Sequence, residues 1–293
     1  MELRHLRYFV AVAEELHFTR AATRLHIAQP PLSQQISQLE EELGVRLLNR
    51  TRRRVELTEP GRQFLASAKE ILAQVDLATF QARRVAQGEV GRINLGMSSS
   101  VTYEDTLPKV LRAYRASYPD VTIHVQEMSP GEQVEALRQG RIQIGFLRTI
   151  RGEPGLSSTL FYREPLIMVL PADHPLAARK RISLRALAEV PFIVIPQSQT
   201  FGGQGLLMEA CLKTGFTPRI AQEAATLQSV ISFVAAGFGA SLVPASVRKL
   251  THSGVAFVEL FPQKIHFEIS AVYLTQRPSP LVDTFLGVLK ATL

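Results

Sequence analysis

The chain has 293 residues, a net charge of +7 at neutral pH and an isoelectric point near 9.8. This length is enough for a small domain and a larger one with a sizeable core, and the positive charge favours a polyanionic partner. The single cysteine, Cys211, excludes an intrachain disulfide framework and favours a reducing, cytoplasmic location. No apolar run reaches the roughly 18 residues of a membrane helix, so we expect no membrane partner.

Residues 18–43 predict two helices separated by a short turn. Thr19 is expected to cap a first helix over residues 20–25. After the turn, Pro30 and Pro31 suit the beginning of a second helix, because proline has a fixed φ and lacks an N–H group. The buried stripe of this second helix is predicted at helical spacing by Leu32, Ile36, Leu39 and Leu43.

The outer face of these two helices carries short amides and hydroxyls, which can reach base edges in a major groove or bind phosphates. The candidate DNA-binding residues on it are Thr19, Arg20, Gln29, Pro30, Pro31, Ser33, Gln34 and Ser37. An ordinary amphipathic hairpin with a polar face is the alternative interpretation. The residues downstream favour DNA.

Beyond Gly44, which is expected to end the second helix, the sequence predicts a two-stranded wing formed by residues 45–48 and 55–57. A basic tip lies between the two strands. Guanidinium groups beside a recognition helix are suited to backbone phosphates, which supply affinity without sequence preference. We therefore predict that Arg50, Arg52, Arg53 and Arg54 bind phosphates or reach the adjacent minor groove.

Several short motifs near the N-terminus occur together in one known family. They are Met1–Glu15, Phe18–Ala22, Gln29–Ile36, Leu39-Glu40, Leu43-Gly44, Leu47-Leu48, Arg50 and Leu57–Gly61. With these motifs the chain resembles LysR-type transcriptional regulators, in particular those of aromatic-compound catabolism. The resemblance implies a winged helix-turn-helix over 1–58, a long dimerising linker helix over 59–88 and an effector-binding domain over 91–293.

The sequence of residues 59–88 itself predicts the linker helix. Its apolar residues alternate spacings of four and three, which is typical of a coiled-coil seam, at Phe64, Ala68, Ile71, Val75, Ala78, Ala82 and Val85. A lone helix packed on its own domain is the alternative. A seam of this length favours a partner helix, so we expect a homodimer, and a homotetramer is the assembly we expect dimers to build.

From Arg92 onward strands alternate with helices, which predicts an α/β fold with a largely parallel sheet covered by helices. The predicted strands are 92–97, 121–127, 142–146, 166–170, 192–195 and 266–274, and the predicted helices are 107–118, 132–139, 205–214, 227–236 and 280–291. Motifs such as Asp173–Leu176 and Leu242–Pro244 extend the family resemblance into this region. The resemblance implies two subdomains hinged like a periplasmic binding protein, subdomain I over about 91–162 plus 267–293 and subdomain II over about 163–266.

Such sheets bind ligands beyond the carboxyl ends of their strands, near helix N-termini. The candidate effector-binding residues at these ends are Ser98, Ser99, Ser100, Thr102, Ser129, Pro130, Phe146, Arg148, Thr200, Phe201 and Gly202. Hydroxyls and free N–H groups suit a carboxylate, and the resemblance to regulators that sense aromatic acids implies the same loops. We expect a small anionic effector, a carboxylate or aromatic acid, and no cofactor.

Signatures of an enzyme are weak. The serines at 98–100 lack the flanking glycines of a nucleophile elbow, and the histidines have no metal-ligand spacing, so we expect neither a catalytic nor a metal site. The prediction is a cytoplasmic, ligand-responsive transcriptional regulator that binds double-stranded DNA, with RNA polymerase as a further candidate partner. A solute-binding module with an N-terminal protein-interaction hairpin is the alternative, and a serine hydrolase is a third.

Overall fold

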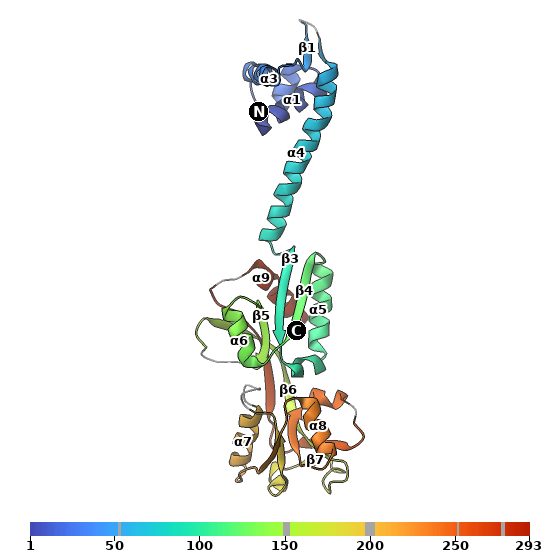
Figure 1. Cartoon of the computed structure of the whole chain (residues 1–293), viewed down its shortest axis with the longest axis vertical. Helices are drawn as coiled ribbons and strands as arrows, with labels where there is room; N and C mark the ends of the chain where they lie inside the picture. The colour runs from blue at the N-terminus through green and yellow to red at the C-terminus, as the bar shows by residue number, and fades with distance from the viewer. Residues whose placement is uncertain (52–53, 149–152, 197–202, 251, 277–278) are drawn as a thin grey trace. The chain divides into compact units, whose positions relative to one another are not determined.

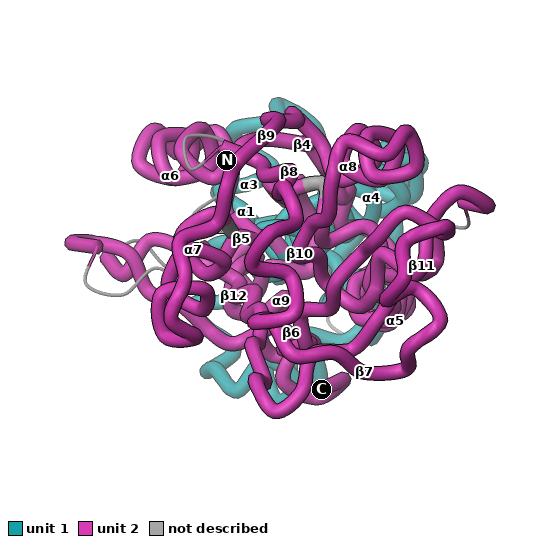
Figure 2. Tube along the Cα trace, turned by 90° about the horizontal axis from the view of Figure 1, so that it is seen from below, with its two compact units in different colours: residues 1–84 teal, residues 85–293 magenta. Residues whose placement is uncertain are grey.

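The computed structural model describes residues 1–51, 54–148, 153–196, 203–250, 252–276 and 279–293. The chain forms two compact units, Met1–Arg84 and Val85–Leu293, which Figure 2 distinguishes by colour. The order of helices and strands can be followed in Figure 1. Among the described residues, no helix combines the length and the apolar character needed to span a membrane.

The first unit begins with three helices, α1 (Leu3–Glu15), α2 (Phe18–Arg24) and α3 (Gln29–Leu43). Their apolar faces meet in one core, in which Phe9, Leu32, Ile36 and Leu39 are fully buried. Three positions of the stripe predicted for the second helix are therefore buried, and the fourth, Leu43, packs against the same core. Gly44 ends α3 with a φ of +68°, a conformation that glycine adopts without steric cost.

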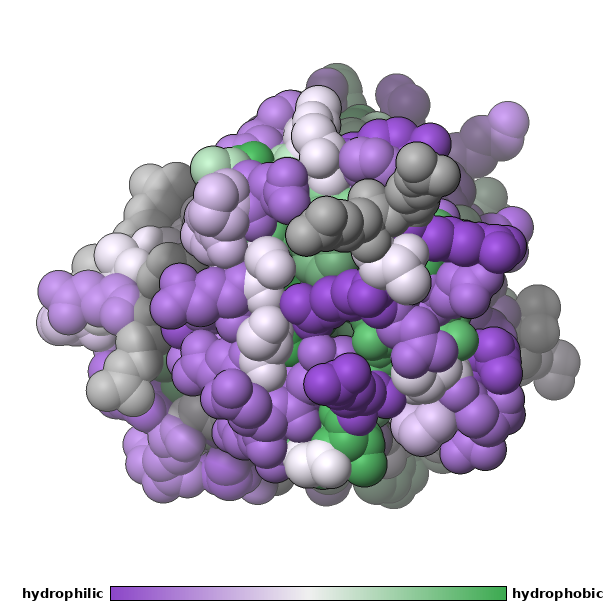
Figure 3. Space-filling view, turned by 90° about the horizontal axis from the view of Figure 1, so that it is seen from above, coloured by the Kyte–Doolittle hydropathy of each residue, from purple (hydrophilic) through white to green (hydrophobic). Residues whose placement is uncertain are grey.

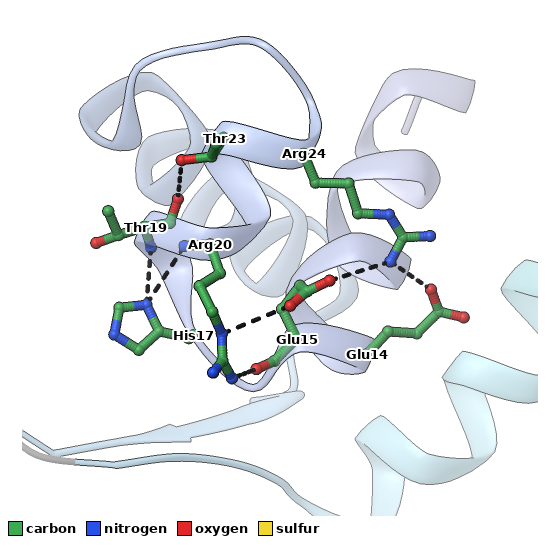
Figure 4. A network of polar contacts seen from close by, with 7 residues as sticks. All are labelled: Glu14, Glu15, His17, Thr19, Arg20, Thr23 and Arg24. Carbon is green, nitrogen blue, oxygen red and sulfur yellow. Dashed lines mark hydrogen bonds and ion pairs between the residues drawn. The ribbon is translucent and has the colours of Figure 1, made fainter.

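The prediction of Thr19 as a helix cap is wrong. Helix α2 begins at Phe18, and its cap is His17, whose Nδ1 accepts hydrogen bonds from the N–H groups of Thr19 at 3.2 Å and Arg20 at 3.4 Å (Figure 4). A ring nitrogen of neutral histidine can accept in the same way as a hydroxyl or carboxylate oxygen. Thr19 lies inside the first turn, where its own N–H needs such a partner.

The wing is the antiparallel pair β1 (Leu48–Arg50) and β2 (Val55–Leu57). The second strand lies where it was predicted, whereas the first begins three residues late. The reason is Glu40 of α3, whose Oε1 accepts hydrogen bonds from the N–H groups of Leu47 at 2.9 Å and Leu48 at 3.0 Å. The Glu40 side chain therefore holds the backbone at Leu47 and Leu48, and pairing with β2 begins only at Leu48.

Helix α4 (Glu59–Ala86) follows the wing. The first residues of the predicted seam pack on the core of their own unit, since Ala68 is fully buried and Phe64 lies 5.2 Å from the ring of Phe9. Further along, the helix exposes large apolar side chains: Ile71 is 40% exposed, Leu77 47%, Phe80 58% and Val85 58%. The helix thus packs on its own unit at one end and presents apolar residues to solvent along the rest.

The second unit is built on a mixed sheet. Strand β3 (Gly91–Met97) pairs in parallel with β4 (Val121–Glu127) and β5 (Ile144–Arg148), whereas β12 (His266–Leu274) runs antiparallel to both β5 and the long strand β6 (Leu156–Pro171). The expectation of a largely parallel sheet is wrong at its centre, because β12 brings the chain back between β5 and β6. The strand order is β4-β3-β5-β12-β6-β11-β7.

Helices and short strands complete this unit. In the part of the unit that contains β3, they are η1 (Ser99–Tyr103), α5 (Thr106–Ser117), α6 (Pro130–Arg138) and α9 (Pro280–Thr292). The remaining elements are β7 (Arg181–Ile182), η2 (Leu184–Leu187), β8 (Phe192–Val194), α7 (Gly203–Lys213), β9 (Ile220–Glu223), α8 (Leu227–Ala235), β10 (Ser241–Pro244), η3 (Ala245–Lys249) and β11 (Val255–Leu260). Every helix predicted in this region is present, with ends shifted by at most two residues.

Strand β6 joins a first hydrophobic core to a second set of cores. Its Phe161 belongs to a first core with residues of β3, α5 and α9, and its Ile167 and Met168 belong to cores formed with β8, β10 and α8. The chain passes from one core to the other at Leu166 and returns at Ile265, where the Leu166 N–H donates to the Ile265 carbonyl at 2.8 Å. Two hydrogen-bonded segments therefore connect the cores.

Candidate functional site

The outer face of α3 carries most of the candidate DNA-binding residues. Gln29, Pro30, Pro31 and Gln34 are exposed, and Ser33 and Ser37 are half-buried. Thr19 of α2 donates a hydrogen bond from its hydroxyl to Oε1 of Gln29 at 3.2 Å, which joins the first turns of the two helices. These residues thus lie on one surface formed by adjacent helices.

Ion pairs hold α2 against α1 beside this surface (Figure 4). Nε of Arg20 lies 3.5 Å from the Glu15 carboxylate, and Nη1 of Arg24 lies 2.8 Å from that of Glu14. Glu14 also pairs with Lys69 of α4 at 2.7 Å. Arg20, a candidate DNA-binding residue, therefore has a partner in the protein, although its side chain is 65% exposed.

Arg50 does not lie at the free tip of the wing. It ends β1, where its Nη2 lies 2.7 Å from Glu40 Oε2 and its Nη1 donates to the Ser37 hydroxyl at 3.2 Å. Its guanidinium carbon also lies 5.0 Å from the centre of the Phe18 ring, a cation–π distance. Arg50 therefore connects the wing to α2 and α3, which the sequence could not reveal without the register of β1.

Arg54, the last arginine of the basic tip, faces solvent. Its side chain is 78% exposed and pairs with Glu56 at 2.8 Å. Arg52 and Arg53 lie outside the described residues. Figure 3 views the end of the first unit that carries β1 in Figure 1, and hydrophilic side chains dominate this face. Such a surface is compatible with contact to a phosphate backbone.

A cavity of about 520 Å³ lies in the second unit where its two sets of cores meet. Of the candidate effector-binding residues, Ser98, Ser100, Ser129, Pro130 and Arg148 line it. They follow or end β3, β4 and β5, the parallel strands whose carboxyl ends meet here. The structure thus brings together residues from three separate loops, as expected for ligands of a parallel sheet.

Other candidates do not reach the cavity. Phe146 is fully buried and packs against Phe161, with ring centres 4.6 Å apart, in the hydrophobic core and outside the cavity lining. Thr102 is exposed and lies outside the cavity lining. The backbone of Ser99 begins η1. Thr200, Phe201 and Gly202 lie outside the described residues.

Two helices point their N-termini at the cavity. Ser129 caps α6 in a capping box, in which its N–H and hydroxyl both donate to Glu132 Oε2, at 2.8 and 2.7 Å. These hydrogen bonds lower the pKa of Glu132 below its usual value. Thr226 caps α8 by accepting from the N–H of Ser229 at 3.1 Å. The positive end of each helix dipole therefore faces the same space.

The other residues that line the cavity were not predicted from the sequence. Their polar or small members are Glu127, Glu132, Ala225 and Thr226, and their apolar members are Met128, Leu166, Ile195, Leu227, Pro244, Phe267 and Ile269. Thr226 carried a usable signal, since a threonine directly before an apolar helix is a typical cap. The apolar residues carried none, because they face the cavity only through the packing of the two cores.

A helix-turn-helix with a wing, followed by an α/β unit with a cavity between its cores, defines the class of ligand-responsive DNA-binding regulators. Residues 3–62 match the family described as "Bacterial regulatory helix-turn-helix protein, lysR family", and residues 86–293 match the "LysR substrate binding domain". The chain belongs to the LysR family of transcriptional regulators. This membership supports the regulator over the solute-binding alternative.

Individual relatives agree. The chain is 40% identical to the transcriptional regulator AlsR of Bacillus subtilis (strain 168), over 98% of this chain and 95% of AlsR. It is 42% identical to the regulator YnfL of Escherichia coli (strain K12), over 89% of this chain and 88% of YnfL. Among solved structures it resembles full-length CbnR in complex with its target DNA, at 31% identity and a TM-score of 0.78, covering 100% of this chain and 99% of that one.

Proposed function

We propose that a small carboxylate binds in the cavity of the second unit and governs DNA binding by this regulator. The observation that carries the proposal is the convergence of Arg148, three hydroxyl-bearing residues (Ser98, Ser100 and Thr226) and the N-terminus of α8 on one space. Guanidinium groups, hydroxyls and helix N-termini each stabilise an anionic oxygen, and they do so more strongly together.

The remaining lining suggests the body of the ligand. Leu166, Phe267 and Ile269 belong to an apolar wall, which favours a hydrocarbon or aromatic group. The acidic Glu132 already accepts two hydrogen bonds from Ser129, and Glu127 is exposed at the end of β4. The carboxylate is therefore expected beside Arg148, away from these two acids, with the apolar group of the effector against the wall.

Thermal unfolding tests this effector class, because a ligand of the folded state raises the melting temperature by mass action. Benzoate and succinate are compared with their neutral amides, benzamide and succinamide. A carboxylate should raise the melting temperature by several degrees, and Arg148→Gln should abolish the shift while the exposed Arg115→Gln of α5 keeps it. A shift with neutral compounds and none with carboxylates would overturn the proposal.

For DNA we propose that Gln29, Ser33 and Gln34 read base edges, with Pro30, Pro31 and Ser37 beside them and Thr19 and Arg20 at the groove edge. Arg52, Arg53 and Arg54 are proposed to bind phosphates. Support comes from the exposure of the α3 face and of Arg54. Arg50 is proposed to orient the wing, since its guanidinium is held by Glu40 and Ser37.

Gel shifts on the DNA upstream of its own gene test this interface. Binding there should exceed binding to random duplex, and equal binding to both would contradict base reading by α3. Arg54→Ala should reduce the slope of log affinity against log salt by about one, the value for one lost phosphate contact. Arg115→Ala, which removes an exposed arginine of the second unit, should leave the slope unchanged.

Assembly and location follow as further proposals. The exposed apolar residues of α4 support a homodimer through this helix, and a tetramer would pair two such dimers. We also propose that the chain acts by binding and has no enzymatic activity. A cytoplasmic location is proposed because a bacterial regulator meets its DNA there, and contact with RNA polymerase stays a prediction of the family resemblance alone.

A further inference from the structure

Gln133 of α6 lies behind the cavity and is completely buried. Its side chain fits into a gap in the sheet where two glycines, Gly96 of β3 and Gly145 of β5, are register partners. A Cβ on Gly96 would lie 3.1 Å from Gln133 Cγ, and a Cβ on Gly145 would lie 2.9 Å from Gln133 Oε1. The amide therefore has one position available, and both neighbouring strands define it.

Its hydrogen bonds determine which way the amide faces. Nε2 lies 3.1 Å from the Met128 carbonyl oxygen and 3.2 Å from the Ser98 hydroxyl oxygen. A carbonyl oxygen can only accept, so the opposite orientation would place two acceptor oxygens in contact. The NH₂ group must therefore face both atoms. The Gln133 Oε1 is buried and accepts no hydrogen bond from the described residues, consistent with an orientation imposed by its NH₂ group.

This orientation has a consequence for Ser98, which lines the cavity. Because the Ser98 Oγ accepts from Gln133, its own hydrogen is available to donate elsewhere. The backbone of Ser98 is fixed as well: its N–H donates to the Phe146 carbonyl at 3.3 Å, and its carbonyl accepts from Val101 N at 3.0 Å. With one lone pair of its oxygen held by Gln133 and its backbone groups engaged, the Ser98 side chain has its hydroxyl hydrogen to offer a ligand.

We propose that Gln133 is a positioning residue that makes the Ser98 hydroxyl a hydrogen-bond donor toward the cavity, so that the site selects an acceptor oxygen over a donor group. This inference rests on the proposed carboxylate effector and adds the residue that enforces its selection. A carboxylate satisfies the donor with either of its oxygens. An isosteric amide does so only with its carbonyl oxygen, because its NH₂ group in that place would set a donor against a donor.

The test compares the binding of benzoate and benzamide by calorimetry. The wild-type protein should prefer benzoate, and Gln133→Leu, of similar size, should reduce this preference on the order of tenfold, because the freed Ser98 hydroxyl can rotate and accept from the amide. In a Ser98→Ala background, Gln133→Leu should change the preference less than about twofold. Gln139→Leu, at the exposed end of the same helix, is the matched control and should leave it unchanged.

The outcomes separate this inference from the proposed function. Equal weakening of benzoate and benzamide by Gln133→Leu would assign a purely structural role and overturn the inference. If Gln133→Leu fails to fold, Gly145→Ala, which displaces Gln133 Oε1, should cause the same loss of preference. If no carboxylate binds the wild type, the proposed function fails. The inference is then tested in the ligand-free protein. If Gln133 holds the Ser98 hydroxyl, the effects of Ser98→Ala and Gln133→Leu on the melting temperature should not add, and additive effects would overturn the inference.

Discussion

Glu40 of α3 and Arg50 of β1 are joined by an ion pair of 2.7 Å, and the other carboxylate oxygen of Glu40 accepts two backbone hydrogen bonds from Leu47 and Leu48. One side chain therefore fixes both the start and the end of the first wing strand relative to α3. Since α3 and the wing are the two proposed DNA contacts, Glu40 sets their separation without touching DNA.

Glu40→Ala should lower the free energy of unfolding by about 1–3 kcal/mol, because it leaves two backbone N–H groups without their acceptor. It should also weaken DNA binding by displacing the wing. Glu41→Ala, at the exposed neighbouring position, is the matched control. Circular dichroism melts and gel shifts measure the two effects, and equal behaviour of both variants would contradict the role of Glu40.

The apolar face of α4 predicts self-association. Ile71→Asp places a charge in the proposed seam and should weaken dimerisation at least about tenfold, since a buried unpaired charge is costly. Ala73→Asp introduces the same charge at an exposed position two residues away, on the opposite side of the helix, and should have little effect. Sedimentation equilibrium gives the dissociation constants. A dimer insensitive to both changes would place the interface elsewhere.

Two helical glycines should respond to alanine in opposite directions. A Cβ on Gly61 would lie 2.0 Å from the Leu47 carbonyl oxygen, so Gly61→Ala must push α4 off the wing and should destabilise by about 1–3 kcal/mol. A Cβ on Gly287 of α9 would meet nothing within 4 Å, so Gly287→Ala should stabilise by about 0.5–1 kcal/mol through helix propensity. Thermal unfolding measures both signs.

Glu164 predicts a pH dependence of stability. It is 7% exposed, accepts from the N–H and hydroxyl of Ser246, and faces Glu104 and Lys249; burial is the largest cause that raises its pKa. A raised pKa means that the charged form is disfavoured in the folded state. This cost is present at neutral pH and disappears as the pH falls through the raised pKa toward 4.5, the ordinary value.

Glu164→Gln should therefore raise the melting temperature at pH 7, and its advantage over the wild type should shrink as the pH is lowered to about 4.5. Glutamine keeps an acceptor oxygen for the Ser246 N–H. Glu259→Gln, at an exposed position of β11, is the control for the loss of a carboxylate. An advantage for Glu164→Gln that grows toward low pH would contradict the assignment.

The sequence predicted elements wherever local patterns decide the structure. The helical spacing of Leu32, Ile36 and Leu39 was enough to place α3, and the alternation of strands and helices was enough to place the helices of the second unit. Strands β7, β9, β10 and β11 were not predicted. The first half of β6 was missed, because its stretch from Leu156 to Pro165 has no regular alternation of apolar and polar residues and pairs with β12, about a hundred residues later.

The sites divide in the same way. Ser98, Ser129 and Arg148 were predictable because each follows or ends a strand of the parallel sheet, and a serine or arginine there has a recognisable chemistry. Phe146 was misplaced, because it lies two residues before the end of β5 and packs inside the core. The contacts of Arg50 with Glu40 and Ser37 were not predicted, since they depend on the register of β1. The hydrogen bond from the buried Gln133 amide to the Ser98 hydroxyl was not predictable, because no local pattern connects these two residues.

The backbone hydrogen bond between Leu166 and Ile265 has a consequence for folding during synthesis. Everything between these residues is one continuous stretch, so the cores it forms can close as soon as Ile265 has left the ribosome. The core nearer the N-terminus cannot, since it needs β12 and α9, which follow Ile265 in the chain. The usual order of folding during synthesis, from the N-terminus onward, is therefore reversed within this unit. Until β12 has been made, β5 and β6 each expose the edge that pairs with it.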